Sequence, residues 1–314
     1  MKNITFIIVT WNNEDCIIQC MESIYKYSNN FKVIIVDNHS SDNTVRVLLE
    51  KKYTNCKVCA LEKNLGFAEA NNYALRYVDT QYICYLNPDT ILIEDIVEPS
   101  IQILEKNCNV GLVGCKLLNK DYTLQPSTFN FLNQYQVYSE AFRLGKLFPN
   151  FIRETFFPNN SKCKNNKYVD WVIGAEMILS TKDAKKVDGF STEYYMYAED
   201  MDICKKINKY LNKKTYYLAD IRLIHIGGVS EAKNFNYSKL EKVIRNKITF
   251  VNKFYGIESA IKTSKALINS YKIRMKLIKI FYWFDNNKRK LYIDKMKNGL
   301  EISKKESQRI RSEK

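Results

Sequence analysis

Apolar residues fall into two kinds of block along the first 115 residues. Continuous, partly β-branched runs indicate strands that are buried on both faces. These runs are ITFIIVTW (4–11), FKVIIVDN (31–38), KVCAL (57–61) and YICYLNPD (82–89). The segments between them carry apolar residues at helical spacing, as at Ile17, Cys20, Met21 and Ile24. Two further helices are predicted over 40–52, with a cap among Ser40 to Asp42, and over 68–78.

This alternation predicts an α/β fold with a mostly parallel sheet and helices on both faces. Ligands bind such sheets beyond the carboxyl ends of the strands. Each of the four predicted strands is followed there by polar or glycine residues. They are Thr10, Trp11 and Asn12; Asp37 and Asn38; Asn64 and Gly66; and Asn87 and Asp89. We therefore expect a binding crevice along this rim.

The middle of the chain is less regular. Residues 116–168, rich in Asn, Phe and Tyr, are expected to form loops, short helices and a mobile flap over the crevice. An apolar run follows from Tyr168 to Ser180, interrupted by Gly174. A helix that ends at Gly189, an amphipathic helix over Glu199–Leu211 and a strand over 215–228 complete the expected body.

Charge separates the last 76 residues from the rest of the chain. The net charge of the whole chain is +15, from 49 basic and 34 acidic residues. Residues 239–314 hold 21 of the basic and seven of the acidic residues, so the preceding 238 residues are almost neutral. We expect two domains, an α/β domain over 1–238 and a basic, amphipathic helical region over 239–314.

The C-terminal region carries helical apolar stripes. One comprises Leu240, Val243, Ile244, Ile248, Val251 and Tyr255. In SYKIRMKLIKIFYWFDNNKRK (270–290), lysine and arginine alternate with apolar and aromatic residues. This pattern is typical of a helix lying in a membrane interface with Phe281, Tyr282, Trp283 and Phe284 at headgroup depth. The alternative is that these helices pack on the body or on a partner chain.

Length and composition set limits. No run approaches the roughly 18 apolar residues of a membrane span, and the N-terminus lacks the features of a signal peptide. A cytoplasmic protein with reduced cysteines is therefore expected. The nine cysteines are scattered, and the pair Cys56 and Cys59 has no second pair to complete a metal site.

Three segments carry candidate chemistry. In Asn87-Pro88-Asp89-Thr90, the carboxylate at a strand end could hold a divalent cation that bridges phosphate oxygens, although the tetrapeptide is also a good turn. His225, followed by two glycines, could be a second metal ligand, although an isolated histidine in an apolar stretch is more often a core residue.

The third segment is Ala198-Glu199-Asp200-Met201-Asp202. Three carboxylates at a helix start complement the helix dipole. One of them could instead face the crevice as a general base. Adjacent Glu199 and Asp200 cannot both face the same way, so at most one is that base.

Seven segments together resemble family 2 glycosyltransferases of the GT-A (Rossmann-like) fold, in the rhamnosyltransferase-like branch. In order they are FIIVTWNN, VIIVDNHSSDNT, NLGFAEANN, YLNPDT, WVIGAEM, YMYAEDMDIC and IHIGGVS, and the similarity covers Ile4 to Ser230. The resemblance implies that 1–238 is the catalytic domain.

The resemblance also implies site roles. Thr10, Trp11 and Asn12 would line the nucleotide pocket, Asp37 would bind the base or ribose, and Asn64, Gly66, Phe67 and Asn71 would lie along the donor. Asn87-Pro88-Asp89 takes the place of the D-x-D motif, with Asn87 in place of its first carboxylate. Asp89 and His225 would hold Mg²⁺ or Mn²⁺. Trp171, Gly174 and Ala175 would shape the acceptor site, with Asp200 as the base and Glu199 beside it.

The implied reaction is an inverting, metal-dependent transfer of one sugar, since the Q-x-x-R-W signature of processive members is absent. The branch favours dTDP-rhamnose as donor, with UDP-hexoses possible, and a glycan or lipid-linked glycan acceptor in bacterial cell-surface polysaccharide synthesis. Residues 270–314 would then place the enzyme peripherally at the inner face of the plasma membrane, on anionic lipid.

Three alternatives remain open at the level of sequence. The basic tail could bind nucleic acid, but the neutral body offers no basic groove, so no nucleic-acid partner is expected. A sugar nucleotidyltransferase usually has a glycine-rich, basic phosphate loop, which TWNNEDC lacks. An inactive scaffold is disfavoured by the presence of Asp89, Asp200 and His225 together.

Overall fold

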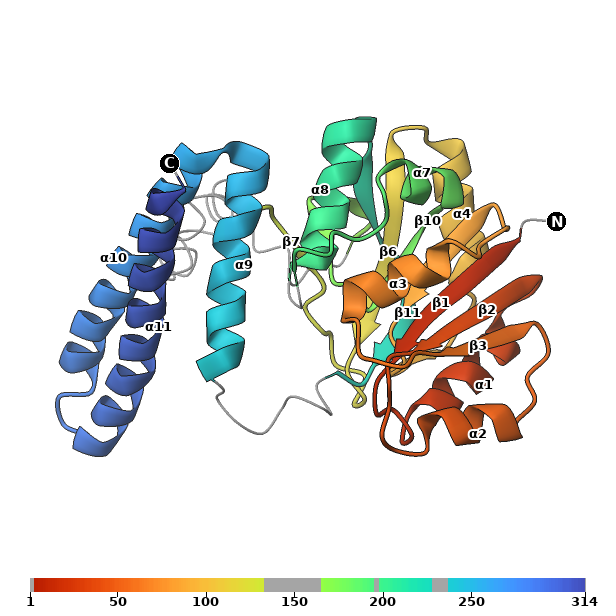
Figure 1. The fold of residues 1–314 in the computed structure, drawn as a ribbon, viewed down its shortest axis with the longest axis horizontal. Coiled ribbons are helices and arrows are strands. Elements are labelled where there is room, and N and C mark those ends of the chain that lie inside the picture. Colours follow the sequence, from red (N-terminus) through yellow and green to blue (C-terminus); the bar gives the residue numbers. More distant parts are fainter. Residues whose placement is uncertain (1–2, 133–164, 195–197, 228–236, 314) are drawn as a thin grey trace. The chain divides into compact units, whose positions relative to one another are not determined.

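The computed structural model describes residues 3–132, 165–194, 198–227 and 237–313 (Figure 1). The chain divides into two compact units. Unit 1 comprises residues 1–130 and 160–232, and unit 2 comprises 131–159 and 233–314. The domain boundary expected from the charge pattern, at 238/239, lies six residues beyond the last junction between these units, at 232/233.

The four strands expected in the N-terminal half form one parallel block of the sheet in unit 1. They are β1 (Ile4–Thr10), β2 (Phe31–Asp37), β3 (Cys56–Ala60) and β4 (Tyr82–Leu86). β1 lies between β2 and β4, and β3 is at the edge. Thr10 pairs with Asp37, which pairs with Ala60, so the carboxyl ends of these strands share one rim.

Counting the described residues, the sheet has nine strands in the order β3-β2-β1-β4-β10-β6-β11-β5, with β8 also paired to β11. The added strands are β5 (Thr90–Leu92), β6 (Val110–Leu118), β8 (Lys167–Val169), β10 (Glu176–Ser180) and β11 (Lys214–His225). β10 runs antiparallel to β4 and β6, whereas β6 and β11 are parallel. The expected α/β architecture with a mostly parallel sheet is confirmed.

Helices cover both faces of this sheet because the strands alternate buried side chains between them. One apolar cluster joins Ile4, Phe6 and Ile8 of β1 to residues of α1 (Ile17–Tyr27), α2 (Thr44–Glu50) and α4 (Val97–Lys106). Three other helices also contact the strands. α3 (Phe67–Leu75) contacts β1 and β2, α7 (Thr181–Lys186) contacts β4 and β10, and α8 (Glu199–Leu211) contacts β6 and β11. The core therefore lies in two layers against the sheet.

Several local predictions need correction. The first helix begins only at Ile17, and the N-cap of α2 is Asn43, although Asp42 accepts a hydrogen bond from the Thr44 N–H at 2.9 Å. The run from Tyr168 to Ser180 is divided among β8, β9 (Trp171–Val172) and β10. β9 pairs with β7 (Thr128–Phe129) in a separate two-stranded sheet. The expected flap falls mainly on 133–164, outside the described residues.

Unit 2 contains the C-terminal helices α9 (Tyr237–Tyr255), α10 (Ile257–Phe281) and α11 (Asn286–Ser312). The helical prediction for this region is confirmed, but the buried stripe of α9 differs from the expected one. Phe250 and Phe254 are buried, whereas Tyr255 is 40% exposed. Glu306 is fully buried on α11 and accepts hydrogen bonds from Arg245 at 3.1 Å and Arg309 at 2.7 Å, so its charge is paired twice.

The segment 270–290 is not one continuous helix. α10 ends at Phe281, and Asp285 caps α11 by accepting the Lys288 N–H at 2.9 Å. A short aspartate side chain satisfies a free N–H at a helix start. The four consecutive aromatics therefore lie at the turn of the α10–α11 hairpin, not along a helix face (Figure 1).

The described residues also answer two questions about the cysteines and about membrane-spanning helices. Its eight described cysteines are free thiols. Within the described residues, no helix combines the length and apolar character needed to cross a bilayer.

Candidate active site

The first two strand ends are joined by a buried carboxylate. Asp37, 2% exposed, accepts hydrogen bonds from the Thr10 hydroxyl at 2.8 Å, the Ser40 hydroxyl at 2.5 Å and the Ser40 N–H at 2.9 Å. Thr10 is itself fully buried. These two residues thus hold the β1 and β2 loops together, and Ser40 is a member of the site that the sequence analysis missed.

The loops above this carboxylate expose the remaining predicted nucleotide-pocket residues. Asn12 adopts a left-handed conformation (φ 56°), and its side-chain carbonyl accepts the Ser41 N–H at 2.8 Å. Asparagine tolerates this region of backbone space better than most residues. Trp11, beside it, is 50% exposed and offers a ring face.

The third strand end is organised by amide side chains. The Asn64 carbonyl oxygen accepts the Gly66 N–H at 2.8 Å and the Asn38 amide at 3.0 Å. Gly66 has φ +83°, a conformation that side chains disfavour, and it starts α3. The loop before α3 is therefore fixed by Asn38 and Asn64.

On α3, the predicted donor residues contribute unequally. Phe67 is half-buried and packs edge-on against Phe190 with a centroid distance of 5.6 Å. Asn71 is 1% exposed and its amide is bound to the Phe67 carbonyl, so it supports the helix. Asn72, which the sequence analysis missed, holds both the N–H and the carbonyl of Phe190, at 2.8 and 2.7 Å.

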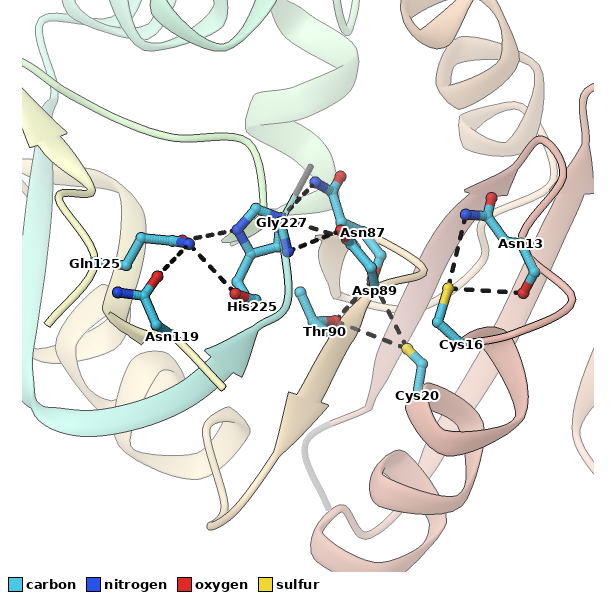
Figure 2. A network of polar contacts seen from close by, with 10 residues as sticks. All are labelled: Asn13, Cys16, Cys20, Asn87, Asp89, Thr90, Asn119, Gln125, His225 and Gly227. Atoms are coloured by element: carbon cyan, nitrogen blue, oxygen red, sulfur yellow. Dashed lines mark hydrogen bonds and ion pairs between the residues drawn. The ribbon is translucent and has the colours of Figure 1, made fainter. Parts of the chain in front are cut away.

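The fourth strand end meets the end of β11. β5 pairs antiparallel with β11, and His225 lies opposite Thr90. This register brings His225 Nε2 within 3.3 Å of Asp89 Oδ1 and of Asn87 Nδ2 (Figure 2). The N–H of Gly227, which has φ +60°, donates to Asp89 Oδ2 at 3.1 Å. The structure thus brings together Asn87, Asp89 and His225, as the sequence predicted.

Electrostatics favour the charged form of Asp89. Burial raises the pKa of its carboxyl, but the hydrogen bond and charge of His225 and the Gly227 N–H together lower it below the ordinary value. Asp89 is therefore an ionised, partly enclosed acceptor. Its side chain is 17% exposed and that of His225 is 13% exposed, so both retain access to a ligand.

The pair suits a divalent cation that arrives with phosphate. Two ligands at about 2.1 Å and at right angles on one octahedral ion lie about 3 Å apart, close to the 3.3 Å between Oδ1 and Nε2. No group of three or more His, Cys, Asp or Glu suited to a metal occurs among the described residues. A carboxylate oxygen and an imidazole nitrogen at this spacing are donors that suit Mg²⁺ or Mn²⁺, so Asp89 and His225 would be the residues to hold such an ion.

Asp200 is linked to this group through the β9–β10 segment. It lies in the first turn of α8, and its Oδ2 accepts the Gly174 N–H at 3.3 Å. The carbonyl of the next residue, Ala175, accepts the Asn87 N–H at 2.9 Å. Asp200, Asn87 and the Asp89–His225 pair are thus connected by consecutive backbone contacts in unit 1.

The two adjacent acids differ in surroundings. Glu199 is only 8% exposed, whereas Asp200 is half-buried. Burial raises the pKa of Asp200 to about 6, although hydrogen bonds from the Met201, Gly174 and its own N–H oppose the shift. A carboxylate with this pKa can accept a proton near neutral pH. Ala198, just before them, has φ 131°, a strained value for a residue with a side chain.

A buried network lies beneath this turn and was not foreseen. Asp202 is fully buried and accepts hydrogen bonds from Ser191 at 2.5 Å and Tyr194 at 3.0 Å. Lys206 Nζ lies 4.0 Å from Asp202 and donates to the Gly189 carbonyl at 2.6 Å. Asp202 therefore ties α8 to the preceding loop, and the first turn carrying Asp200 is held by it.

The predicted acceptor residues lie beside Asp200. Trp171 stacks on Phe129 with a centroid distance of 4.7 Å and donates its indole N–H to the Asn130 carbonyl at 3.0 Å. Gly174 contacts Asp200, but Ala175 is fully buried and offers the site only its backbone. Trp171 is the member of this set with accessible surface.

The chain is similar in sequence to known proteins. Residues 5–153 match the model described as Glycosyl transferase family 2. The match begins in β1 and includes all four polar strand ends.

A full-length relative extends the match. The rhamnosyltransferase WbbL of Escherichia coli (strain K12) is 27% identical over 234 residues, which cover 70% of this chain and 81% of that protein.

Solved structures share the fold. GalNAc-T7 with UDP, GalNAc and Mn²⁺ has a TM-score of 0.58 at 13% identity, over 80% of this chain and 48% of that one. S. aureus TarS 1–349 in complex with UDP-GlcNAc has a TM-score of 0.53 at 15% identity, over 98% of this chain and 92% of that one.

Proposed function

The chain belongs to the family 2 glycosyltransferases, and we propose that it transfers a single sugar from a nucleotide-sugar donor, with inversion and with a divalent cation. The proposed pathway is cell-surface polysaccharide synthesis, and the acceptor is a glycan or a lipid-linked glycan. dTDP-rhamnose is the favoured donor, since a relative matched over 234 residues is named as a rhamnosyltransferase. UDP-hexoses remain the second choice, since a fold neighbour was solved with UDP-GlcNAc.

One observation carries this proposal. The proposed base, Asp200, is joined to the proposed cation-binding pair, Asp89 and His225, through Gly174, Ala175 and Asn87. A displacement at an anomeric carbon needs a base on the acceptor side and charge stabilisation on the diphosphate side. The contacts support such an arrangement of the two groups within one site.

In this mechanism, Asp200 accepts the proton of the acceptor hydroxyl as that oxygen attacks the anomeric carbon. The carbon–oxygen bond to the diphosphate breaks in the same displacement, so the configuration inverts. Asp89 and His225 would hold the cation, which would supply positive charge against the negative charge that develops on the departing diphosphate. Trp11 and the loops fixed by Asp37 and Asn64 enclose the nucleotide.

The first experiment screens dTDP- and UDP-sugars, with and without Mn²⁺, against wild-type protein and Asp200→Asn. Asn keeps the size of the side chain but cannot take a proton. We expect turnover to fall at least 100-fold, the lower end of the range for general base catalysis, with donor binding nearly unchanged. Asp79→Asn, an exposed acid paired with Lys32, is the matched control and should behave as wild type.

Wild-type turnover in Asp200→Asn would remove that residue from the mechanism. Turnover that persists in excess chelator would exclude the cation.

We further propose that the α10–α11 hairpin docks on an anionic membrane surface. Its distal half, residues 271–298, contains no fully buried residue. Ile280, Phe281, Trp283 and Phe284 at the turn are 64–73% exposed. Residues 272–297 carry nine lysines and arginines against two aspartates. Aromatic side chains surrounded by basic residues favour an anionic lipid interface, whereas a second copy of the same surface would repel.

A further inference from the structure

His225 makes a second contact on the side of its ring away from Asp89. Its Nδ1 lies 2.8 Å from Gln125 Oε1 (Figure 2). Gln125 follows β6, and its N–H donates to the Leu117 carbonyl at 3.0 Å. The imidazole is therefore held between an amide on one side and the Asn87–Asp89 turn on the other.

Four further hydrogen bonds fix which atom of Gln125 faces the histidine. The Gln125 amide nitrogen donates to Asn119 Oδ1 at 3.0 Å and to the His225 carbonyl at 3.3 Å. The Asn119 amide nitrogen donates to the Thr123 hydroxyl at 2.9 Å, which donates to Asp121 at 2.5 Å. An ionised carboxylate can only accept, and hydrogen bonds to Thr123 lower the pKa of Asp121. The side chains of Gln125, Asn119 and Thr123 thus donate one to the next, ending at Asp121.

The direction of the series determines the state of the imidazole. With its oxygen toward the ring, Gln125 can only accept from His225, so the proton must be on Nδ1. Without a cation, Nε2 can also carry a proton and donate it to the Asp89 carboxylate. A cation between the two would replace that proton, and the neutral ring would then present its Nε2 lone pair to the cation.

We propose that Gln125 is a positioning residue that holds His225 in the Nδ1–H tautomer and aims Nε2 at the cation site. The inference rests on the proposed metal role of His225. Histidine ligands of metals usually donate their second ring N–H to such a partner, which fixes the ring and raises its basicity. Gly227 provides the room for this arrangement, because a Cβ there would lie 3.2 Å from Gln125 Nε2.

The tautomer can be measured directly because the chain has only two histidines, His39 and His225. Long-range ¹H–¹⁵N spectra of ¹⁵N-histidine protein with Mg²⁺ and UDP or dTDP present, at about pH 8.5, two units above the ordinary histidine pKa, distinguish the two ring nitrogens. His39→Asn assigns the signals. We expect wild-type His225 to be protonated on Nδ1. Protonation on Nε2 would overturn the proposal without any variant.

Variants test the dependence on Gln125. Gln125→Met keeps the side-chain length but removes the acceptor, so we expect a mixture of tautomers. It should also weaken Mn²⁺ binding roughly tenfold, the lower end for such supporting residues. Gln125→Glu restores an acceptor and should restore the Nδ1–H tautomer. Gln102→Met, at a half-buried position of α4, is the matched control.

Mn²⁺ affinity is measured with UDP or dTDP present, from the electron paramagnetic resonance signal of free Mn²⁺. An unchanged tautomer and an unchanged affinity in Gln125→Met would overturn the role of Gln125. His225→Ala separates the role of Gln125 from the proposed metal role of His225. If the His225→Ala variant binds Mn²⁺ as wild type does, His225 is not a metal contact. If that variant loses Mn²⁺ binding while Gln125→Met keeps it, only the role of Gln125 fails.

Discussion

At the scale of single residues, carboxyl groups of unit 1 differ in ways that their surroundings explain. Asp89 faces a histidine and a glycine N–H, and its pKa is lowered. Asp200 receives only backbone hydrogen bonds in a buried turn, and its pKa is raised to about 6. Opposed shifts of this kind separate a charge-binding acid from a proton acceptor.

The pKa of Asp200 predicts an acid limb in the pH dependence of transfer. The base works only when ionised, so turnover should be constant well above pH 6 and fall roughly tenfold per pH unit below it. Turnover at saturating donor and acceptor between about pH 5 and pH 8 measures this, with circular dichroism confirming that the fold persists. A flat profile across this range would contradict Asp200 as the titrating base.

Glu176 offers a residue-scale prediction about stability. It is 2% exposed, accepts the Cys115 N–H at 2.7 Å, and burial raises its pKa from 4.5 to about 7. Between these values the folded state keeps the proton that the unfolded state releases. Stability should therefore fall as pH rises from 4.5 to 7, by on the order of 3 kcal/mol, and then level off.

Glu176→Gln removes this titration. Urea unfolding below pH 4.5 and above pH 7 measures the free energy of unfolding of both proteins. Relative to wild type, the variant should be more stable at the higher pH than at the lower pH. The exposed Glu50→Gln is the control. An equal difference at both pH values would show that Glu176 does not titrate in this way.

At the scale of elements, pairing and packing decide where side chains meet. β11 pairs with β8 through Thr215–Tyr217 and with β5 through Leu223–His225. In its parallel pairing with β6, the register shifts between Leu218 and Arg222. The pairing with β5 places His225 beside Asp89. In unit 2, α10 and α11 approach closely at Gly299, where a Cβ would lie 2.3 Å from the Tyr271 ring.

Gly299→Ala should therefore destabilise the hairpin. Alanine favours a helix over glycine by about 1 kcal/mol, but overpacking typically costs about 1–3 kcal/mol, so a net loss is expected. Thermal unfolding followed by circular dichroism measures it. Tyr271→Ala/Gly299→Ala removes the obstructing ring. In a double-mutant cycle, this variant should lose less stability than the sum of the losses in the two single variants. A Tm at or above wild type in Gly299→Ala would refute the close packing.

At the scale of the whole molecule, charge and function are divided along the chain. Residues 239–314 supply nearly all of the net charge, while the proposed catalytic groups lie in unit 1. A lipid-linked acceptor is confined to a membrane, so a basic hairpin with exposed aromatics would raise its local concentration at the enzyme.

Flotation with vesicles tests this division. Wild type should float with vesicles that contain phosphatidylglycerol, less so at high salt because charge attraction is screened, and weakly with phosphatidylcholine alone. Trp283→Ser/Phe284→Ser should lose at least tenfold of the binding, since each buried aromatic contributes about 1.5–3 kcal/mol. Tyr210→Ser, 56% exposed on α8, is the control. Equal flotation of the double variant would contradict docking through the turn.

The sequence by itself determined the strand and helix blocks, the α/β class and the polar rim, because hydrophobic periodicity and strand ends are local properties of the chain. It also singled out Asp89, Asp200 and His225, through motifs whose order along the chain is recognisable. It did not reveal the contacts that Gln125, Asn72 and Asp202 make in the folded chain, since nothing near these residues in sequence marks their partners. Only the tertiary structure decided which ring nitrogen faces Asp89, which of two adjacent acids is accessible, and where the hairpin turns, because each depends on contacts between residues far apart in the chain or on the packing around them.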